Sequence, residues 1–423
     1  MKTVQHSTLS NGIRVVSEAM PHLETASVGV WVDVGARYED QAINGISHML
    51  EHMAFKGTTT RSARRIAEEI ENAGGYLNAY TTREHTTYYA RVLKDDVALA
   101  VDLLGDILTN PRFDDVELAR EKDVIIQEIG GANDTPDDLV FEMLQETAYP
   151  NQPIGRSILG TPDRVRAISR DDLIAFMATH YTGENMVIAA AGNIDHDALV
   201  PMLEDAFGRL PSSASRLWVP ATYQGGTRMT DRTLEQVHVC FGLNSLAFDH
   251  PDYFALQVYS MILGGGMSSR LFQEIREERG LAYSIYSFVS PHADAGLFGV
   301  YAGTHPSMVA GLAPLVADEM KKMLAGASDE EMIRARAQLK AGLLMSLEST
   351  SARIEQLGRQ MLIFDRDIPT AELVQEIDAV DVDAVRRVAE ETLASQLSVA
   401  GVGQGEIMGE HERLAGMFSL TAA

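Results

Sequence analysis

Two histidines and a glutamate near residue 50 have the spacing of a metal site. The stretch His48-Met49-Leu50-Glu51-His52 separates the histidines by four residues, so both lie on one face of a helix with 3.6 residues per turn. Neutral imidazoles in that arrangement can bind one zinc ion from the same side. Glu51 adjoins the second histidine and can reach over the site without being a ligand. The spacing therefore predicts a zinc centre with Glu51 as its general base.

A third ligand must come from elsewhere, because a catalytic zinc ion usually has three protein ligands and one open position for water. Glu128 is the best candidate. It lies in a stretch whose apolar residues predict a long amphipathic helix, and Glu121 precedes it by two turns, so both carboxylates face the same way. One can bind the metal while the other holds a histidine N–H or the bound water. The alternative is that both belong to the solvated face of an acidic helix.

Blocks along nearly the whole chain resemble one family of metallopeptidases. His48–Thr58, which reads HMLEHMAFKGT, is similar to the zinc-helix block of the pitrilysin family, whose motif is the inverzincin His-x-x-Glu-His. The similarity is strongest to the β-subunit of the mitochondrial processing peptidase and its bacterial homologues. It extends from Leu9–Val16 near the start to Gly264–Phe272 in the second half.

This resemblance implies the composition of the metal site. His48, His52 and Glu128 would hold one Zn²⁺ ion per chain. Glu51 would take a proton from water during attack on a peptide carbonyl and deliver it to the leaving amine. Glu121 would be a supporting catalytic residue that orders the site from outside the ligand set.

The resemblance also implies residues that bind substrate. Asn78 and Ala79 match the family's strand that pairs with the substrate backbone. Arg276 and Tyr283 match an arginine and a tyrosine of the C-terminal domain, where the arginine anchors substrate and the tyrosine donates to the developing oxyanion. Without the resemblance, a surface arginine and a core tyrosine would be the simpler interpretation.

The order of predicted elements repeats once along the chain, which indicates a duplication. Residues 86–93 and 296–303 both have strand patterns, and the apolar strand at 186–194 has a counterpart at 396–402. We expect an α+β fold with two duplicated domains, each a mainly antiparallel sheet packed with helices. A Pro/Ser/Gly-rich stretch predicts a zinc-binding catalytic domain at 1–215 and a homologous domain at 225–423 that supplies Arg276 and Tyr283. The resemblance implies that the domains form a clam-like chamber.

Composition narrows the partners and the compartment. A formal net charge of −25 excludes nucleic acid as an expected partner, and either attracts basic peptides or simply keeps the protein soluble. No apolar run predicts a transmembrane helix or a signal peptide, so no membrane partner is expected. The one cysteine, Cys240, cannot form an internal disulfide, which indicates the cytoplasm.

Together these features predict a zinc metalloendopeptidase that cleaves extended peptides or unfolded precursor segments and works as a homodimer. Two alternatives remain: a non-catalytic assembly subunit, or one subunit of a heterodimeric processing peptidase. The resemblance implies that non-catalytic members lose part of the His-x-x-Glu-His set, whereas this chain keeps it. The short Gly264–Gly266 run argues against the glycine-rich partner subunit of such a heterodimer.

Overall fold

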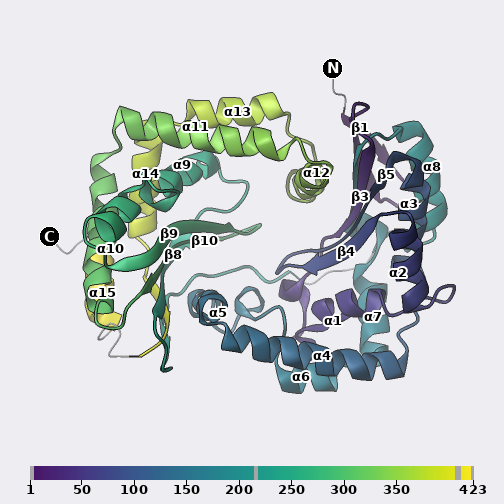
Figure 1. The fold of residues 1–423 in the computed structure, drawn as a ribbon, viewed down its shortest axis with the longest axis horizontal. Coiled ribbons are helices and arrows are strands. Elements are labelled where there is room, and N and C mark those ends of the chain that lie inside the picture. Colours follow the sequence, from purple (N-terminus) through teal and green to yellow (C-terminus); the bar gives the residue numbers. More distant parts are fainter. Residues whose placement is uncertain (1–3, 214–217, 405–410, 421–423) are drawn as a thin grey trace. The chain divides into compact units, whose positions relative to one another are not determined.

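The computed structural model describes residues 4–213, 218–404 and 411–420, and these form two compact units, each built around one β-sheet (Figure 1). Unit 1 comprises Met1–Ile129, Arg156–Val219 and Met345–Ile368. Unit 2 comprises Gly130–Gly155, Pro220–Leu344 and Pro369–Ala423. The chain therefore passes between the units several times.

The sheet of unit 1 has six strands in the order β1-β2-β6-β3-β5-β4. The strands are β1 (Val4–Thr8), β2 (Arg14–Ala19), β3 (Thr25–Val32), β4 (Tyr76–Thr81), β5 (Thr86–Leu93) and β6 (Met186–Gly192). The central strands β3 and β6 are buried almost throughout, because helices cover both faces of the sheet. Strand β4 lies at an edge and pairs only with β5 among the described residues.

The sheet of unit 2 repeats this arrangement in the order β7-β11-β8-β10-β9. Its strands are β7 (Gly226–Thr230), β8 (Val237–Ser245), β9 (Ala282–Pro291), β10 (Gly296–Thr304) and β11 (Ser398–Val402). Strands β7, β8, β9, β10 and β11 have the same places in the order of this sheet as β2, β3, β4, β5 and β6 have in the sheet of unit 1. The parallel pair β2–β6 also recurs as β7–β11, and the other pairs are antiparallel. The predicted duplicated α+β fold is confirmed.

Helices pack on both sheets. Unit 1 contains α1 (Ile46–Ala54), α2 (Ala63–Asn72), α3 (Val97–Thr109), most of α4 (Asp115–Asp134), α6 (Pro162–Ala167), α7 (Arg170–His180), α8 (His196–Phe207) and α12 (Thr350–Phe364). Unit 2 contains α5 (Pro136–Ala148), α9 (Tyr253–Gly264), α10 (Leu312–Lys322), most of α11 (Asp329–Ser346), α13 (Thr370–Ala379), α14 (Val382–Leu393) and α15 (His411–Phe418). Within the described ranges, no helix combines the length and apolarity needed to cross a membrane.

Two helices belong to one unit although the chain before and after them belongs to the other. Helix α5 packs on β7, β8 and β11 of unit 2, and α12 packs on β2, β3 and β6 of unit 1. The predicted boundary between 215 and 225 is close to the crossing at Val219, although residue 215 lies outside the described residues. The division into homologous halves at 1–215 and 225–423 stays a prediction.

Two glycines inside helices should respond to alanine in opposite ways. A Cβ added at Gly130 in α4 would meet nothing within 4 Å. Since glycine in a helix interior costs about 0.5–1 kcal/mol relative to alanine, Gly130→Ala should raise the melting temperature. Gly358 in α12 is the matched control, because a Cβ there would lie 2.4 Å from Trp31 Cδ2. Gly358→Ala should lower the melting temperature, and a rise would contradict the close packing of α12 on β3.

Candidate metal centre

Helix α1 carries the histidine motif and is fixed by its apolar face. Ile46, Met49, Leu50 and Met53 are buried in the core of unit 1. The histidines point the other way, because they sit on the opposite face of the same short helix. The helix begins after Gly45, whose φ of 98° lies in the left-handed region that glycine readily adopts.

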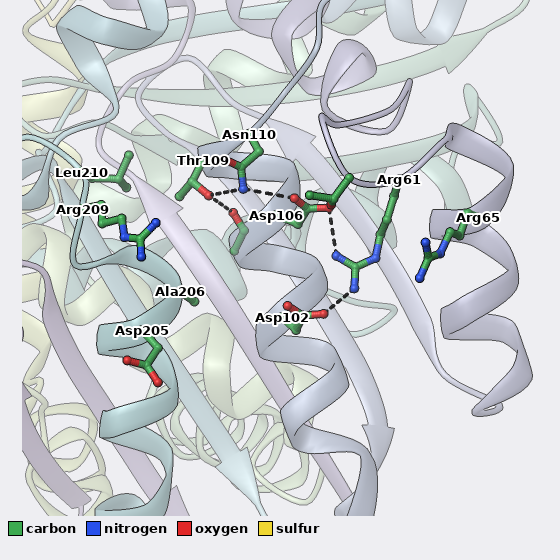
Figure 2. A pocket seen from close by; sticks show the side chains of 12 residues that line it. Arg61, Arg65, Asp102, Asp106, Thr109, Asn110, Asp205, Ala206, Arg209 and Leu210 are labelled. Atoms are coloured by element: carbon green, nitrogen blue, oxygen red, sulfur yellow. Dashed lines mark hydrogen bonds and ion pairs between the residues drawn. The ribbon is translucent and has the colours of Figure 1, made fainter.

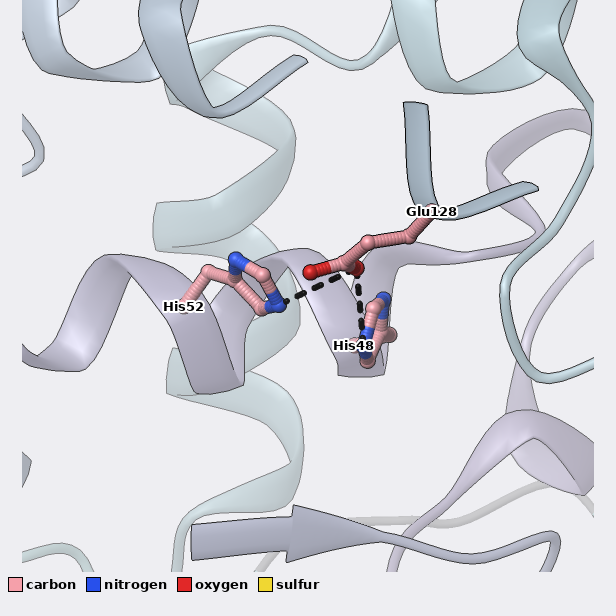
Figure 3. Close-up of side chains that lie close together, drawn as sticks. All are labelled: His48, His52 and Glu128. Carbon is pink, nitrogen blue, oxygen red and sulfur yellow. Dashed lines mark ion pairs between the residues drawn. The ribbon is translucent and has the colours of Figure 1, made fainter. Parts of the chain in front are cut away.

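Helix α4 brings Glu128 to both imidazoles (Figure 3). Glu128 Oε2 lies 3.8 Å from His48 Nε2 and 3.5 Å from His52 Nε2. One potential ligand atom from each of the three residues lies within 4.8 Å of the others. Two donors bound to one tetrahedral zinc ion at about 2.1 Å are about 3.4 Å apart. The three predicted donors therefore lie at separations that fit a single metal ion.

Glu121 holds His52 from the side away from Glu128. Its Oε2 lies 2.9 Å from His52 Nδ1, and its Oε1 forms an ion pair with Lys56 Nζ at 2.6 Å. With a proton on Nδ1 donated to this carboxylate, His52 keeps the lone pair of Nε2 for a metal ion. Helical spacing alone did not decide which of the two carboxylates would bind a metal ion. In the structure Glu128 lies beside the Nε2 atoms of both histidines, and Glu121 lies beside Nδ1 of His52.

His48 is suited to metal binding by its protonation state. Burial lowers its pKa to about 4, with a smaller contribution from the nearby ring of His52. Near neutral pH the imidazole is therefore uncharged and its lone pair is available. Its Nδ1 is buried and has no hydrogen-bond partner among the described residues.

The side chain of Glu51 extends from α1 to the edge strand β4. Thr81 Oγ1, at the end of β4, donates to Glu51 Oε2 at 2.6 Å. Burial raises the pKa of Glu51, although the hydrogen bond from Thr81 acts in the opposite direction. Asn78 and Ala79 lie on the same strand, where the Ala79 N–H donates to Asn78 Oδ1 at 2.9 Å. The open edge of the sheet therefore ends beside Glu51.

The contacts of Thr81 with Glu51 and of Lys56 with Glu121 were not predicted from the sequence. Lys56 lies beyond the end of α1 at Ala54 and pairs with Glu121 of α4, so helical spacing does not predict this contact. No sequence pattern marks the contact between Thr81 and Glu51, because it depends on how β4 packs against α1.

Arg276 and Tyr283 lie together in unit 2, whereas all the candidate metal ligands lie in unit 1. Arg276 belongs to a π-helical turn, Phe272–Glu277, of a kind that is frequent at functional sites. Its guanidinium lies 4.7 Å from the Phe272 ring centroid and 5.4 Å from that of Tyr283. Tyr283 is 72% exposed on β9, so its interpretation as a core residue is wrong.

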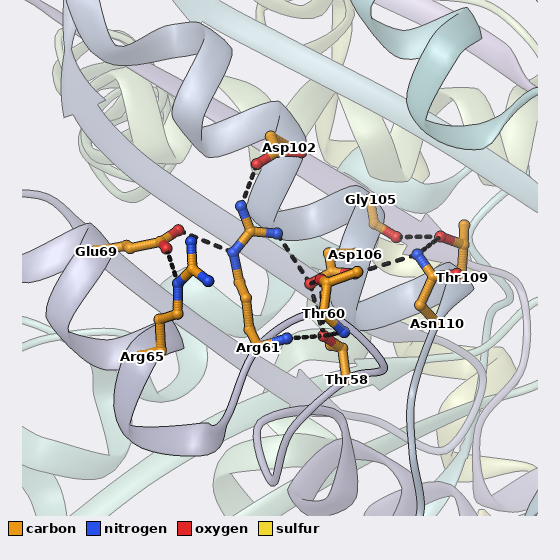
Figure 4. Close-up of polar contacts among 10 residues, drawn as sticks. All are labelled: Thr58, Thr60, Arg61, Arg65, Glu69, Asp102, Gly105, Asp106, Thr109 and Asn110. Carbon is orange, nitrogen blue, oxygen red and sulfur yellow. Dashed lines mark hydrogen bonds and ion pairs between the residues drawn. The ribbon is translucent and has the colours of Figure 1, made fainter.

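A polar cluster fixes the chain just after α1 (Figure 4). Asp106 on α3 is buried and accepts hydrogen bonds from four groups. The donors are Thr58 Oγ1 at 2.7 Å, Thr60 Oγ1 at 2.7 Å, Arg61 Nη1 at 2.9 Å and Asn110 Nδ2 at 3.1 Å. Thr58, Thr60 and Arg61 lie shortly after the end of α1 at Ala54, so Asp106 fixes the segment that leaves α1 to helix α3.

The same cluster lines part of a cavity of about 640 Å³, in which Arg61 lies between Asp102 and Asp106 (Figure 2). Arg61 also pairs with Glu69 at 2.8 Å. Three carboxylates therefore surround this one guanidinium, and its charge is already balanced. The arrangement ties α2 to α3 and does not leave Arg61 free for an anionic ligand.

Two family models match consecutive parts of the chain. One, described as insulinase (peptidase family M16), matches residues 14–162, and the other, described as peptidase M16 inactive domain, matches residues 167–339. All candidate metal ligands fall within the first match.

Individual proteins are similar over almost the whole chain. An uncharacterized zinc protease of Rickettsia felis is 38% identical over 95% of this chain and 98% of its own length. A probable mitochondrial-processing peptidase subunit beta of Arabidopsis thaliana is 40% identical over 94% of this chain and 78% of its own length. The crystal structure of a protease from Helicobacter pylori has the same fold, with a TM-score of 0.89 at 23% identity over 96% of this chain and 100% of that one.

The Asp106 cluster predicts a pH dependence of stability. Burial alone would raise the pKa of Asp106, but its four hydrogen-bond donors outweigh burial and hold that pKa below its usual range. A carboxyl whose pKa is depressed on folding stabilises the protein above its unfolded pKa of about 3.9 and loses this contribution as the pH falls further. Asp106→Asn should therefore lower the unfolding free energy by about 2 kcal/mol at pH 7 and by much less near pH 3.

Melting temperatures measured from pH 7 to pH 3 would check this expectation. Asp163→Asn is the matched control, because the Asp163 side chain is 95% exposed and pairs only at the surface with Arg166 at 3.0 Å. The control should melt like the unsubstituted chain at every pH. An Asp106→Asn deficit that stayed constant across this pH range would contradict the argument from the depressed pKa.

Proposed function

The chain belongs to peptidase family M16, and from the geometry of its metal centre we propose that it is a zinc-dependent endopeptidase. The observation that carries the proposal is the convergence of His48, His52 and Glu128 within 4.8 Å, with Glu51 on the same helix. We propose that these three residues hold one Zn²⁺ ion per chain.

The chain's own residues divide the remaining work. A bound zinc ion supplies a Lewis acid that brings the pKa of a coordinated water toward about 7 and polarises the scissile carbonyl. Glu51 accepts the proton of the attacking water and delivers it to the leaving amine, a role that its raised pKa suits. Thr81 holds one carboxylate oxygen of Glu51, which leaves the other oxygen to carry the proton. Glu121 keeps His52 in the tautomer that binds metal, and Lys56 balances its charge.

The proposed substrate is an extended peptide that adds to the free edge of β4. Strand addition relies on main-chain hydrogen bonds and needs little side-chain specificity. The Ala79 N–H is satisfied by Asn78 Oδ1, so rotation of the Asn78 side chain would free it for a substrate carbonyl. Folded proteins offer no free strand and should be poor substrates, whereas basic peptides suit a chain with a net charge of −25.

We also propose that unit 2 contributes to substrate binding through Arg276 and Tyr283. Stacking of the Arg276 guanidinium near the Tyr283 ring holds the pair together, and the exposed phenol can donate to a developing oxyanion. The proposed assembly is a homodimer in a reducing compartment such as the cytoplasm, where Cys240 stays a buried thiol.

A heterodimeric processing peptidase is the second candidate, because a relative that is 40% identical is named as a subunit beta. Size-exclusion chromatography of the purified chain, with activity assayed in the same fractions, separates the two candidates. Activity in a fraction of twice the chain mass is expected. Activity that appears only after another protein is added would contradict the homodimer.

Glu51→Gln tests the general base. The substitution preserves the size of the side chain but removes its ability to take a proton, so zinc content should be unchanged while peptide cleavage falls by at least about 100-fold. Cleavage of a quenched-fluorescent basic peptide would be followed beside zinc analysis of the same protein. Removal of the metal from the unsubstituted chain with a chelator should abolish cleavage, and added Zn²⁺ should restore it.

The exposed Glu68→Gln variant is a control for the loss of one negative charge, since Glu68 pairs only with Arg64 on the surface of α2. It should cleave like the unsubstituted chain. Near-normal cleavage by Glu51→Gln would remove Glu51 from the mechanism. Zinc binding without any cleavage by the unsubstituted chain would favour the non-catalytic alternative or a missing partner subunit.

A further inference from the structure

Helix α1 has no side-chain cap of its own. Its N-cap residue is Gly45, so the first backbone N–H groups need acceptors from elsewhere. Glu39, upstream in the chain, provides them. Its Oε2 accepts from the Gly45 N–H at 2.7 Å, and its Oε1 accepts from the Ser47 N–H at 2.8 Å. The side-chain amide of Asn44 donates to Oε2 at 2.8 Å.

The Glu39 carboxylate is enclosed and rigidly placed. It is only 3% exposed, and Arg156 Nη2 donates to the backbone carbonyl of the same residue at 2.7 Å. Asn44 also donates to the backbone oxygen of Ser157 at 3.1 Å, which ties this corner to a distant part of unit 1. All the groups that contact the carboxylate are donors, which favour its ionised form, although burial outweighs them and raises the pKa of Glu39. A negative charge at a helix N-terminus is further stabilised by the helix dipole.

The two histidines of the metal centre are supported in different ways. The ring of His52 is oriented by Glu121 at 2.9 Å, whereas Nδ1 of His48 is buried without a hydrogen-bond partner among the described residues. No side chain of the described structure therefore fixes the His48 ring through that nitrogen. His48 directly follows Ser47, whose N–H is held by Glu39. The backbone of the first turn is thus the element available to aim His48.

We propose that Glu39 is a positioning residue of the metal centre, which aims His48 by holding the first turn of α1. It acts through the backbone and does not contact the metal. Glu121 orients His52 through a hydrogen bond to its imidazole ring, whereas Glu39 orients His48 through the backbone of the first turn. This inference rests on the proposed zinc function.

Glu39→Gln is the decisive substitution. The side chain keeps its size, but its amide group turns an N–H toward a backbone N–H of Gly45 or Ser47, so the first turn must shift. Because supporting residues outside the ligand set typically change metal affinity by 10- to 100-fold, zinc binding should weaken by at least about tenfold. The affinity would be measured on metal-free protein by competition with a zinc indicator. The visible spectrum of the Co²⁺-loaded protein should also change, since it reports the ligand geometry directly.

Glu331→Gln is a matched control in unit 2. The Glu331 carboxylate also accepts a backbone N–H near a helix start, from Ser328 at 2.8 Å, and pairs with Arg270 at 2.7 Å. Its loss should lower the melting temperature but leave the zinc affinity and the Co²⁺ spectrum unchanged. This comparison separates a general loss of stability from the aiming of His48.

Asn44→Ala provides a milder second variant, because it removes one donor and keeps both backbone hydrogen bonds of Glu39. Its zinc affinity should lie between those of the unsubstituted chain and Glu39→Gln. If Glu39→Gln does not fold, unchanged zinc binding by Asn44→Ala overturns the inference and weakened binding supports it. Unchanged affinity in a folded Glu39→Gln variant overturns the inference alone. Failure of the unsubstituted chain to bind zinc overturns the proposed function as well.

Discussion

The hydrogen bond between His52 Nδ1 and Glu121 Oε2 is the interaction on which the geometry of the candidate metal centre depends. It joins α1 to α4, two helices that are distant in sequence. Glu121 is 5% exposed, and in a poorly solvated environment such a charge-assisted bond is strong while a broken one is costly. Lys56 supplies the opposite charge that a buried carboxylate requires. Because Glu128 lies two turns further along α4, the same bond also sets where Glu128 meets the two imidazoles.

Acidic residues with little solvent exposure hold α1, which carries the candidate metal-binding histidines, at its beginning, near its end and in the segment that follows it. Glu39 accepts the first N–H groups of α1, Glu121 accepts from His52, and Asp106 accepts from the segment that follows. Each carboxylate accepts hydrogen bonds from protein donors, which replace the solvent that burial removes. Part of the strongly acidic composition thus has a structural use, which the net charge alone would not reveal. A short helix held at three points can keep its ligands near one geometry before any metal binds.

The two units show how one topology supports different uses. Helix α9 follows β8 and precedes β9, as α1 follows β3 and precedes β4. In α9 the buried residues are almost all apolar, including Leu256, Val258 and Ile262, and no candidate metal ligand lies on it. The repeated sheet therefore serves as a scaffold in both units, while the candidate metal ligands lie on α1 and α4 of unit 1. Helix α5 packs on the sheet of unit 2 although the chain on either side of its segment belongs to unit 1, and α12 does the reverse. The strand order that the two sheets share is not affected.

The sequence by itself determined the features that depend on local periodicity. Helical spacing pairs His48 with His52 and aligns Glu121 with Glu128, and the repeated order of strands reveals two similar sheets. Resemblance to a family added Arg276 and Tyr283, which the structure places together. Only the tertiary structure decided that Thr81 touches Glu51 and that Glu39 caps α1. It places Glu128, which the resemblance implied as the third ligand, beside the Nε2 atoms of both histidines. It also decided that α5 packs in unit 2 and α12 in unit 1. These contacts join residues whose proximity depends on the packing of a whole unit, and no local pattern in the chain encodes that packing.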